Sequence, residues 1–357
     1  MFRRMLACFV CTLFFATQVL AFGPRGHAAV GAIADQKLAG TATGAKVSTM
    51  LNGMSLEKAA LVADDIKSCD THPNTFVISG QPALTQQMRE FLIANPSTAS
   101  HFNHHAYHYV DIPVEGTSEY MSGTTGRSDV DVVKTMEFCV KVLKGIESDN
   151  NARKITKPVA LILLSHYVGD MHQPLHVGTE YFDNAGHPVN PDVTGTTANS
   201  DKGGNGLTTH LLNSSGDLQI MGSLHSYWDS KAVTGAFDLL QAEIIAAAIP
   251  GGASDGQVAK YLATQTPTGW VAVTTPAEGW SLAWANEMMP QARQAHQKFN
   301  FSSMSINTTK HTAAGQAIEK PVASGADTYT QFAAKATRDN IHKAGWRLAA
   351  LLEQAIP

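Results

Sequence analysis

Two short stretches of this 357-residue sequence place a histidine and an aspartate four residues apart. His166 and Asp170 lie in LILLSHYVGDMHQPLH, and His225 and Asp229 lie in LHSYWD. Residues at i and i+4 share one face of a helix. A buried imidazole or carboxylate is costly unless it is hydrogen-bonded, ion-paired or bound to a metal. Together with His176, the two pairs offer five ligands suited to zinc.

A single His–Asp pair on a helix is also typical of a hydrogen-bonded couple in a protein core. Two such pairs, each in a similar apolar setting, are harder to explain in that way. The chain also contains 15 histidines, whereas His is normally a minor residue. The sequence therefore favours a metal site over two structural couples.

Two further segments add possible ligands. Asp64 ends an apolar helical stretch, and Lys67 follows one turn later. His108 opens the stretch HYVDIP, which we expect to be an apolar strand. A cluster just upstream is expected to be a solvated histidine-rich loop and comprises His101, His104 and His105.

Helical periods dominate the elements that must position these residues. Helices are expected at 27–39, 55–67, 128–147, 157–172, 223–247, 255–264, 279–298 and 326–354. The helix at 157–172 is apolar nearly all round, which predicts a central, buried helix. Extended structure is expected at 107–112 and in a short hairpin at 208–220, and long loops at 178–207 and 299–325. No βαβ alternation is present, so we expect one all-α domain with long loops and at most a short β-hairpin.

The N-terminus is typical of a secretory signal. Arg3 and Arg4 precede an apolar run, and small Ala21 follows it. The alternative is an N-terminal membrane anchor, but the run is shorter than the ~20 residues that a span needs. We therefore expect a signal peptide at 1–21 and a secreted or periplasmic mature domain at 22–357.

Charge and cysteine content add two constraints. The formal net charge of −4 does not indicate a basic surface for nucleic acid or membrane. After removal of the signal only Cys69 and Cys139 remain, and the sequence leaves open whether they pair.

These motifs, taken in order, resemble a known family. The matching pieces are FGPRGH, VADD, HYVDIP, HxxxDxHQPLHxG, GGN, LHSYWDS and AGWRLAALL. They are similar to the secreted zinc-dependent single-strand nucleases of the S1/P1 type from fungi, plants and bacteria. That family is related in fold to the bacterial zinc phospholipases C. The resemblance spans essentially the whole mature chain.

The resemblance implies a site with three zinc ions. One ion would take Asp64, His108, His166 and Asp170, and a second would take His176, His225 and Asp229. The third would take His27, the shared Asp170, and the amino nitrogen and carbonyl oxygen of Phe22. The family usually begins with Trp where this chain has Phe22, and commonly has Trp where it has Val62. The first change involves only backbone ligands, so coordination should be preserved.

Roles for neighbouring residues follow from the same resemblance and from phosphodiester chemistry. Asp64 would position or deprotonate the attacking water, and Lys67 would hold a phosphate oxygen, unless it is simply a solvent-facing lysine. Tyr109 would stack on an unpaired base while Asp111 accepts hydrogen bonds from its exocyclic amine, which would favour single strands. The alternative places Tyr109 in the core and Asp111 at a turn. Asn205, in the GGN motif, would contact substrate.

The expected activity is endonucleolytic cleavage of single-stranded DNA and RNA to 5′-phosphorylated products, with 3′-nucleotidase activity. We expect a monomer without a stable protein partner. A zinc phospholipase C on the same scaffold is the alternative enzyme. Such an enzyme would need an apolar, lipid-facing rim in place of Tyr109 and Asp111. A zinc-scavenging protein without catalysis is the non-enzymatic alternative, and the presence of Asp64 beside the full ligand set argues against it.

Overall fold

A computed structural model describes residues 22–116, 119–194, 198–213 and 215–356 of the chain. The expected signal peptide at 1–21 lies outside these residues. In the described part of the chain, no helix combines the length and the apolar character that crossing a membrane requires.

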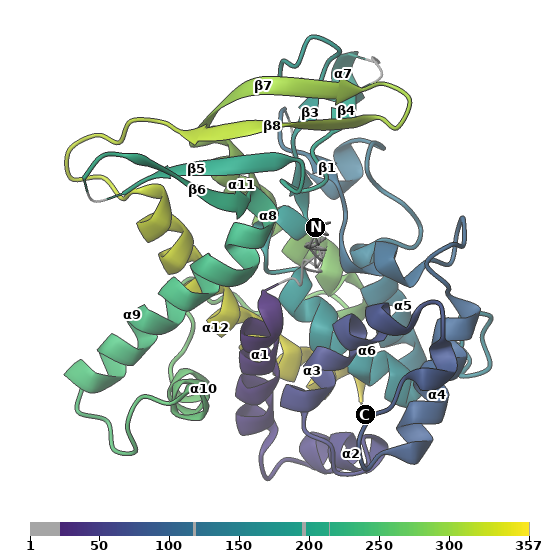
Figure 1. The fold of residues 1–357 in the computed structure, drawn as a ribbon. Coiled ribbons are helices and arrows are strands. Elements are labelled where there is room, and N and C mark those ends of the chain that lie inside the picture. The colour runs from purple at the N-terminus through teal and green to yellow at the C-terminus, as the bar shows by residue number, and fades with distance from the viewer. Residues whose placement is uncertain (1–21, 117–118, 195–197, 214, 357) are drawn as a thin grey trace, which may run out of the picture.

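Helices form most of the molecule and surround a buried centre in the lower part of Figure 1. The α-helices are α1 (Gly23–Leu38), α2 (Ala42–Met50), α3 (Leu56–Asp65), α4 (Pro82–Ala94), α5 (Val132–Lys144), α6 (Lys157–Asp170), α7 (Pro191–Thr194), α8 (Leu224–Ser226), α9 (Val233–Ala246), α10 (Asp255–Thr264), α11 (Trp280–Gln297) and α12 (Tyr329–Ala355). Short 3-10 turns are η1 (Ile66–Cys69), η2 (Pro73–Thr75), η3 (His104–His108), η4 (Tyr120–Ser122), η5 (Pro174–His176) and η7 (Ala277–Gly279), and η6 (Tyr227–Ala232) is a π-helical segment.

The central helix is α6, as predicted. Thr156 caps its first turn by accepting the amide of Val159, and Pro174 stops continuation beyond its end. Every residue from Val159 to Asp170 is buried. The helix packs against α1, α3, α5 and α12, so it occupies the interior of the helical part. His166 and Asp170 are therefore held where water cannot solvate them.

The sheet lies on one side of this helical part (Figure 1). Its strands are β3 (Tyr181–Phe182), β4 (Asn199–Ser200), β5 (Leu207–Leu212), β6 (Leu218–Ser223), β7 (Phe299–Asn307) and β8 (Thr312–Glu319). The order is β3-β4-β8-β5-β6, and β7 pairs antiparallel with β8. A separate two-stranded pairing joins β1 (Ile112–Pro113) to β2 (Gly178–Thr179) in parallel.

The all-α prediction is therefore only roughly right, because the chain is mostly helical but also has a six-stranded sheet. The hairpin predicted at 208–220 is present as β5 and β6. The loop predicted at 299–325 is wrong, because it contains β7 and β8. A register shift between Ser302 and Ser305, with a positive φ of 52° at Ser303, breaks the alternation of β7. A strand interrupted by a bulge does not show the period of two in its sequence.

The predicted helices agree with the structure better than the predicted strands and loops do. The bounds of α10 match the predicted helix at both ends, whereas α2 and α4 were not predicted. Only Val47 of α2 is buried, so that helix carries little apolar signal. The strand predicted at 107–112 is wrong over most of its length: His108 ends the 3-10 turn η3, and pairing begins only at Ile112. Cys69 and Cys139 are both unpaired thiols.

Candidate metal centre and active site

Asp170 lies at the centre of a buried group of imidazole rings. Its Oδ2 is 2.9 Å from Nδ1 of His108 and 3.3 Å from Nε2 of His166. Its Oδ1 is 3.4 Å from Nε2 of His27 and 3.8 Å from Nδ1 of His176. Burial acts to raise the pKa of this carboxyl, but the imidazoles hold that pKa well below its usual range. Asp170 is thus a carboxylate surrounded by nitrogen ligands from three parts of the chain.

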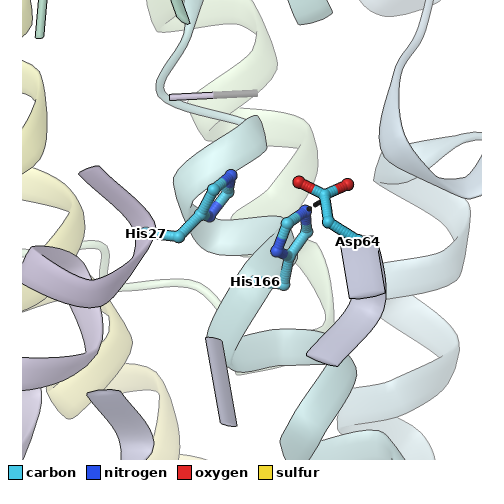
Figure 2. A group of neighbouring side chains, drawn as sticks. All are labelled: His27, Asp64 and His166. Carbon is cyan, nitrogen blue, oxygen red and sulfur yellow. Dashed lines mark ion pairs between the residues drawn. The ribbon is translucent and has the colours of Figure 1, made fainter. Parts of the chain in front are cut away.

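His166 is fixed by a hydrogen bond to the backbone and by stacking against the ring of His27, which lies beside it in Figure 2. Its Nδ1 donates to the carbonyl oxygen of Ala60 over 2.7 Å. Burial acts to lower the pKa of this imidazole, but Asp170 and Asp64 raise it. When the ring is neutral, Nε2 carries the lone pair, and it lies 3.6 Å from Oδ1 of Asp64. The ring of His27 stacks on it, with centroids 3.7 Å apart. A Cβ at Gly169 would lie 2.7 Å from Nδ1 of His27, so glycine allows this approach.

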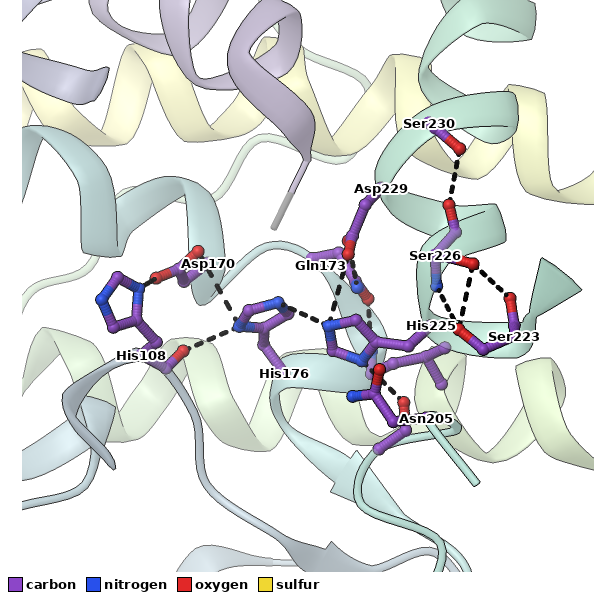
Figure 3. A network of polar contacts seen from close by, with 12 residues as sticks. His108, Asp170, Gln173, His176, Asn205, Ser223, His225, Ser226, Asp229 and Ser230 are labelled. Atoms are coloured by element: carbon purple, nitrogen blue, oxygen red, sulfur yellow. Dashed lines mark hydrogen bonds and ion pairs between the residues drawn. The ribbon is translucent and has the colours of Figure 1, made fainter. Parts of the chain in front are cut away.

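His176 and His225 form a second pair of rings (Figure 3). The Nδ1 of His176 donates to the carbonyl oxygen of His108 over 2.8 Å. The Nδ1 of His225 donates to the carbonyl oxygen of Gly203 over 2.7 Å. Their Nε2 atoms face one another at 3.1 Å. Burial lowers the pKa of both rings, that of His225 to about 4. Two neutral rings held in this way point lone pairs at each other, an arrangement that a shared cation stabilises.

Asp229 completes this second group from the π-helical segment η6. Its Oδ1 accepts a 2.8 Å hydrogen bond from Gln173, and its Oδ2 lies 3.4 Å from Nε2 of His225. Burial raises the pKa of this carboxyl to about 8. π-helical turns are rare and occur frequently at functional sites. Gln173 was not singled out in the sequence, and it orients a candidate ligand.

Several atoms of this cluster are buried without a hydrogen-bond partner. They are Nδ1 and Nε2 of His27, Nε2 of His108, Nε2 of His166, Oδ1 of Asp170 and Oδ2 of Asp229. Buried polar atoms are normally satisfied, so each exception needs an explanation. Imidazole nitrogens and carboxylate oxygens are ligands of divalent transition metals, and these orphaned atoms fit such ions.

The structure divides the cluster into three groups whose ligand atoms lie within 4.8 Å of one another. The groups are His27, Asp64 and His166; His108, His166 and Asp170; and His176, His225 and Asp229. The eight side chains expected at the metal site thus meet in one buried region. His27 lies closer to Asp64 and His166 than its expected set implies, while it also remains near Asp170.

Phe22 lies at the beginning of α1 beside this cluster. Its side chain is buried, and its ring centroid is 6.4 Å from that of His27. Its carbonyl oxygen accepts the amide of Gly26 over 3.1 Å. A Cβ at Gly23 would lie 2.7 Å from the carbonyl oxygen of Asp229, so only glycine fits here. Residues 22 and 23 therefore pack directly against η6, the element that carries Asp229.

An open cavity of about 630 Å³ leads to the cluster. Its lining includes His108, His176 and His225 from the metal cluster, together with Lys67. The Nζ of Lys67 lies 2.7 Å from Oδ1 of Asp64, and its side chain is only 13% exposed. Lys67 is therefore not a solvent-facing lysine, because it pairs with a candidate ligand at the cavity wall.

The residues expected to bind a base lie in the same cavity. Tyr109 is 41% exposed and lines it, which excludes the alternative of a core tyrosine. Asp111 also lines the cavity and accepts a 2.6 Å hydrogen bond from Thr179, and burial raises the pKa of its carboxyl to about 6. Asn205 also lines the cavity, and its side-chain amide donates to the carbonyl oxygen of Lys202.

The comparisons with known proteins agree with this geometry. The family model of the S1/P1 nucleases matches residues 22–357. The chain belongs to the S1/P1 nuclease family. No curated protein matches the chain. The S1/P1 nucleases are hydrolases that act on phosphodiester bonds and depend on metal, and the buried His and Asp groups of this member are suited to hold it.

Sequence reasoning missed basic side chains at the cavity of this S1/P1 nuclease. Lys202, Lys310 and His311 line it, the last two from the turn between β7 and β8. All three residues lie in the segments 178–207 and 299–325, which are predicted to be long loops, and a loop prediction does not show which site its residues face. The low net charge of the whole chain gives no signal of where its lysines gather.

A buried ion pair beneath the sheet was also missed. The Nε2 of His296, at the end of α11, lies 3.1 Å from Oδ2 of Asp201, and both side chains are fully buried. The carboxylate raises the pKa of His296 to about 9, although burial opposes this. Asp201 begins the turn that contains Gly203, whose carbonyl oxygen orients His225. The ion pair between His296 and Asp201 therefore helps to hold the turn that orients His225.

The expectation of a solvated histidine-rich loop is wrong in part. His101 is exposed and pairs with Asp129, as expected. His104 is fully buried, and both it and His105 lie against Asp70. The 3-10 turn η3 buries His104 and leaves His105 partly exposed.

Proposed function

We propose that this S1/P1 nuclease is an exported, zinc-dependent endonuclease that cleaves single-stranded DNA and RNA to 5′-phosphorylated products. We further propose that it removes the phosphate from 3′-nucleotides and works as a monomer without a stable protein partner. The single observation that carries the proposal is the pair of opposed Nε2 atoms of His176 and His225 at the end of an open cavity. A cation bound by these two nitrogens would face a molecule that enters the cavity.

The proposed centre holds three zinc ions. Asp64, His108, His166 and Asp170 would hold the first, and His176, His225 and Asp229 the second. His27, Asp170 and the backbone of Phe22 would hold the third. When bound, zinc supplies Lewis-acid polarisation of the phosphodiester and acidifies water. Three divalent ions against these carboxylates also make the floor of the cavity positive, which suits an anionic substrate.

Two protein residues act on the water and the phosphate. Asp64 orients the attacking water and accepts its proton, while Lys67 binds a phosphate oxygen on which charge develops. The water oxygen forms a bond to phosphorus as the bond between phosphorus and the 3′-oxygen breaks, and the proton that Asp64 accepted from the water passes to the leaving 3′-oxygen. The products are a 5′-phosphate and a free 3′-hydroxyl.

Strand selection is assigned to the cavity wall. The exposed ring of Tyr109 stacks on an unpaired base, and Asp111 and Asn205 contact its polar edge and the adjoining backbone. Stacking of this kind is worth about 1–3 kcal/mol per base and tolerates many sequences. A base inside a duplex cannot reach the ring, so single strands are preferred. Lys202, Lys310 and His311 at the rim contact flanking phosphates.

Export follows from the N-terminal residues. The proposed signal peptide, 1–21, is removed after Ala21, and the family match begins at Phe22. Removal frees the amine of Phe22 beside the metal cluster. We propose a secreted or periplasmic location on this basis, with residues 22–357 as one catalytic domain.

A substrate panel tests the proposal. The mature protein is assayed on denatured DNA, RNA, duplex DNA, a 3′-nucleotide and phosphatidylcholine vesicles, each with and without a chelator. We expect turnover of both single-stranded polymers and the 3′-nucleotide, slower turnover of duplex, none of lipid, and loss of activity on chelation. Preferred release of the phosphatidylcholine headgroup would instead support the phospholipase C alternative. Bound zinc without any turnover would support a scavenging protein.

A further inference from the structure

A second cluster of metal-binding side chains lies beside the cavity, outside the centre described above. Asp70 follows directly after η1, and His104 and His105 begin η3. The Nε2 of His104 is 2.6 Å from Oδ1 of Asp70, and the Nε2 of His105 is 2.7 Å from Oδ2. One ligand atom from each residue lies within 4.8 Å of the other two. We call these three residues the rim triad.

The hydrogen bonding of the rim triad is incomplete. The Nε2 of His105 is buried and close to a carboxylate oxygen, but it makes no hydrogen bond. The Nδ1 of the fully buried His104 also has no partner. Buried polar atoms are normally satisfied, and imidazole nitrogens without partners are suited to bind a metal ion.

The protonation states of the rim triad suit a cation. Burial lowers the pKa of His104 to about 4, so this imidazole is neutral near pH 7. Burial acts to raise the pKa of Asp70, but hydrogen bonds from His104 and Ser97 lower it, so the carboxylate is ionised. The neutral imidazole of His104, the ring of His105 and the carboxylate of Asp70 form a donor set that zinc accepts, and the carboxylate supplies one negative charge for the ion to neutralise.

The exposure of the rim triad leaves room for further ligands. The side chain of His104 is fully buried, whereas those of Asp70 and His105 are 16% and 42% exposed. His105 also lines the cavity that leads to the main cluster. A site with three protein ligands and one open side leaves at least one position for water or an anion.

We propose that Asp70, His104 and His105 form an additional zinc site at the rim of the cavity, separate from the three-ion centre. It binds zinc more weakly than that centre, because the side chains of Asp70 and His105 are open to solvent whereas those of the centre are buried. The inference does not depend on the nuclease reaction, since it concerns only the number and place of bound ions.

A zinc titration of the mature protein tests the site. Wild type, Asp70→Asn, His105→Ala and His101→Ala are equilibrated with graded free zinc, and bound zinc per chain is measured by elemental analysis. We expect wild type to bind one equivalent more than Asp70→Asn and His105→Ala at saturation. His101→Ala is the matched control from the same loop, because His101 pairs with Asp129 outside the rim triad. It should bind as much zinc as wild type.

Two features keep the result decisive. Asp70→Asn preserves the shape and a hydrogen-bonding partner for His104, and His105 is partly exposed, so both variants should fold, which circular dichroism checks. Failure of the three-ion centre would lower the zinc content of all four proteins together and leave the difference of one equivalent intact. Equal saturation of wild type, Asp70→Asn and His105→Ala would overturn the rim site, as would an equal loss in His101→Ala.

Discussion

The helical part and the sheet of this nuclease hold their functional side chains in different ways. In the helical part and its adjoining turns, His166, His176 and His225 are buried, and each donates Nδ1 to a backbone carbonyl. At the sheet, Lys202 and Lys310 are exposed at turns. Fixed rings suit atoms whose geometry the reaction demands, whereas long exposed side chains suit a flexible polymer whose position varies. The proposed chemistry and the proposed base stacking by Tyr109 thus belong to the helical part and its turns, whereas the proposed contacts to flanking phosphates belong to the sheet.

The two parts also have separate hydrophobic clusters. The larger one surrounds α6, and a smaller one lies beneath the sheet and contains Trp228 and Tyr329, which share a 2.8 Å hydrogen bond. Asp170 comes from the first part, while Asp229 neighbours Trp228 in the second. The metal cluster therefore lies where the two parts meet, and bound ions would join them.

Loss of Asp170 should have the largest effect, because its carboxylate contacts four imidazoles. Asp170→Asn should lower kcat/KM by more than about a hundredfold, beyond what residues that only orient ligands cause. Asp229→Asn should lower it less, because the carboxylate of Asp229 lies against one imidazole, that of His225. Steady-state kinetics and zinc analysis measure both.

Asp65→Asn is the matched control, since Asp65 adjoins Asp64 in α3 but is exposed and belongs to none of the metal groups. It should retain wild-type kinetics. Activity in Asp170→Asn close to that of the Asp65 variant would remove the central carboxylate from the account.

The pH dependence of stability should separate the sheet from the helical part. His296 has its pKa raised to about 9 by Asp201, so its stabilising effect is complete below about pH 6.5 and is lost as pH rises towards 9. Glu180, whose pKa burial raises to about 8, acts in the same direction. The double variant Asp201→Asn, His296→Gln keeps the shapes and removes both charges of the pair.

Between pH 6.5 and 9, wild type should lose roughly 3 kcal/mol more unfolding free energy than the double variant. Denaturant unfolding at each pH, at constant free zinc, measures this difference. Both proteins keep the same metal ligands, so the pH dependence of zinc binding is common to them. Parallel stability curves would show that the buried pair does not titrate in this range.

Tyr109→Ala should weaken the binding of single strands. Removal of a stacking partner worth about 1–3 kcal/mol should raise KM about 5- to 150-fold and leave the zinc content unchanged. Tyr109→Phe keeps the ring and should behave like wild type. An unchanged KM in Tyr109→Ala would place base binding elsewhere in the cavity.

The sheet-side lysines should give the smallest effect. Lys202→Ala combined with Lys310→Ala should raise KM a few-fold at low salt and reduce the slope of log KM against log salt by ~0.7 per lysine. Lys335→Ala is the control, because Lys335 is exposed but pairs with Asp327 away from the cavity lining. A slope unchanged by the double substitution would show that the sheet does not contact the polymer.

The contrast between the helical part and the sheet also explains which features the sequence could predict. The period of 3.6 placed His166 and Asp170 on one face of α6, and Thr156 and Pro174 bounded that helix. No local pattern reveals that His296 meets Asp201, because 95 residues separate them. His27 entered only through resemblance, since a histidine in the first turns of a helix has no distinctive period.

The sheet resisted prediction for a different reason. The bulge at Ser303 and the polar residues of β7 hid a strand, so Lys310 and His311 were not connected with the cavity. The inward fold of His104 was also hidden, because its partner Asp70 is distant in sequence and a 3-10 turn gives no amphipathic pattern. Contacts between turns depend on the assembled structure.

The most direct test of the account is the zinc content of the mature protein at low free zinc, measured on chains with and without an N-terminal extension. The chain that begins with the free amine of Phe22 should hold about three zinc ions, and removal of them should abolish activity and lower the melting temperature. A chain that begins with Met before Phe22 should fold, hold about two ions and lose most activity, because an amide nitrogen is a poor ligand. A fully active protein with one ion or none would contradict the proposed centre, and equal zinc and turnover in both chains would exclude the amine of Phe22 from it.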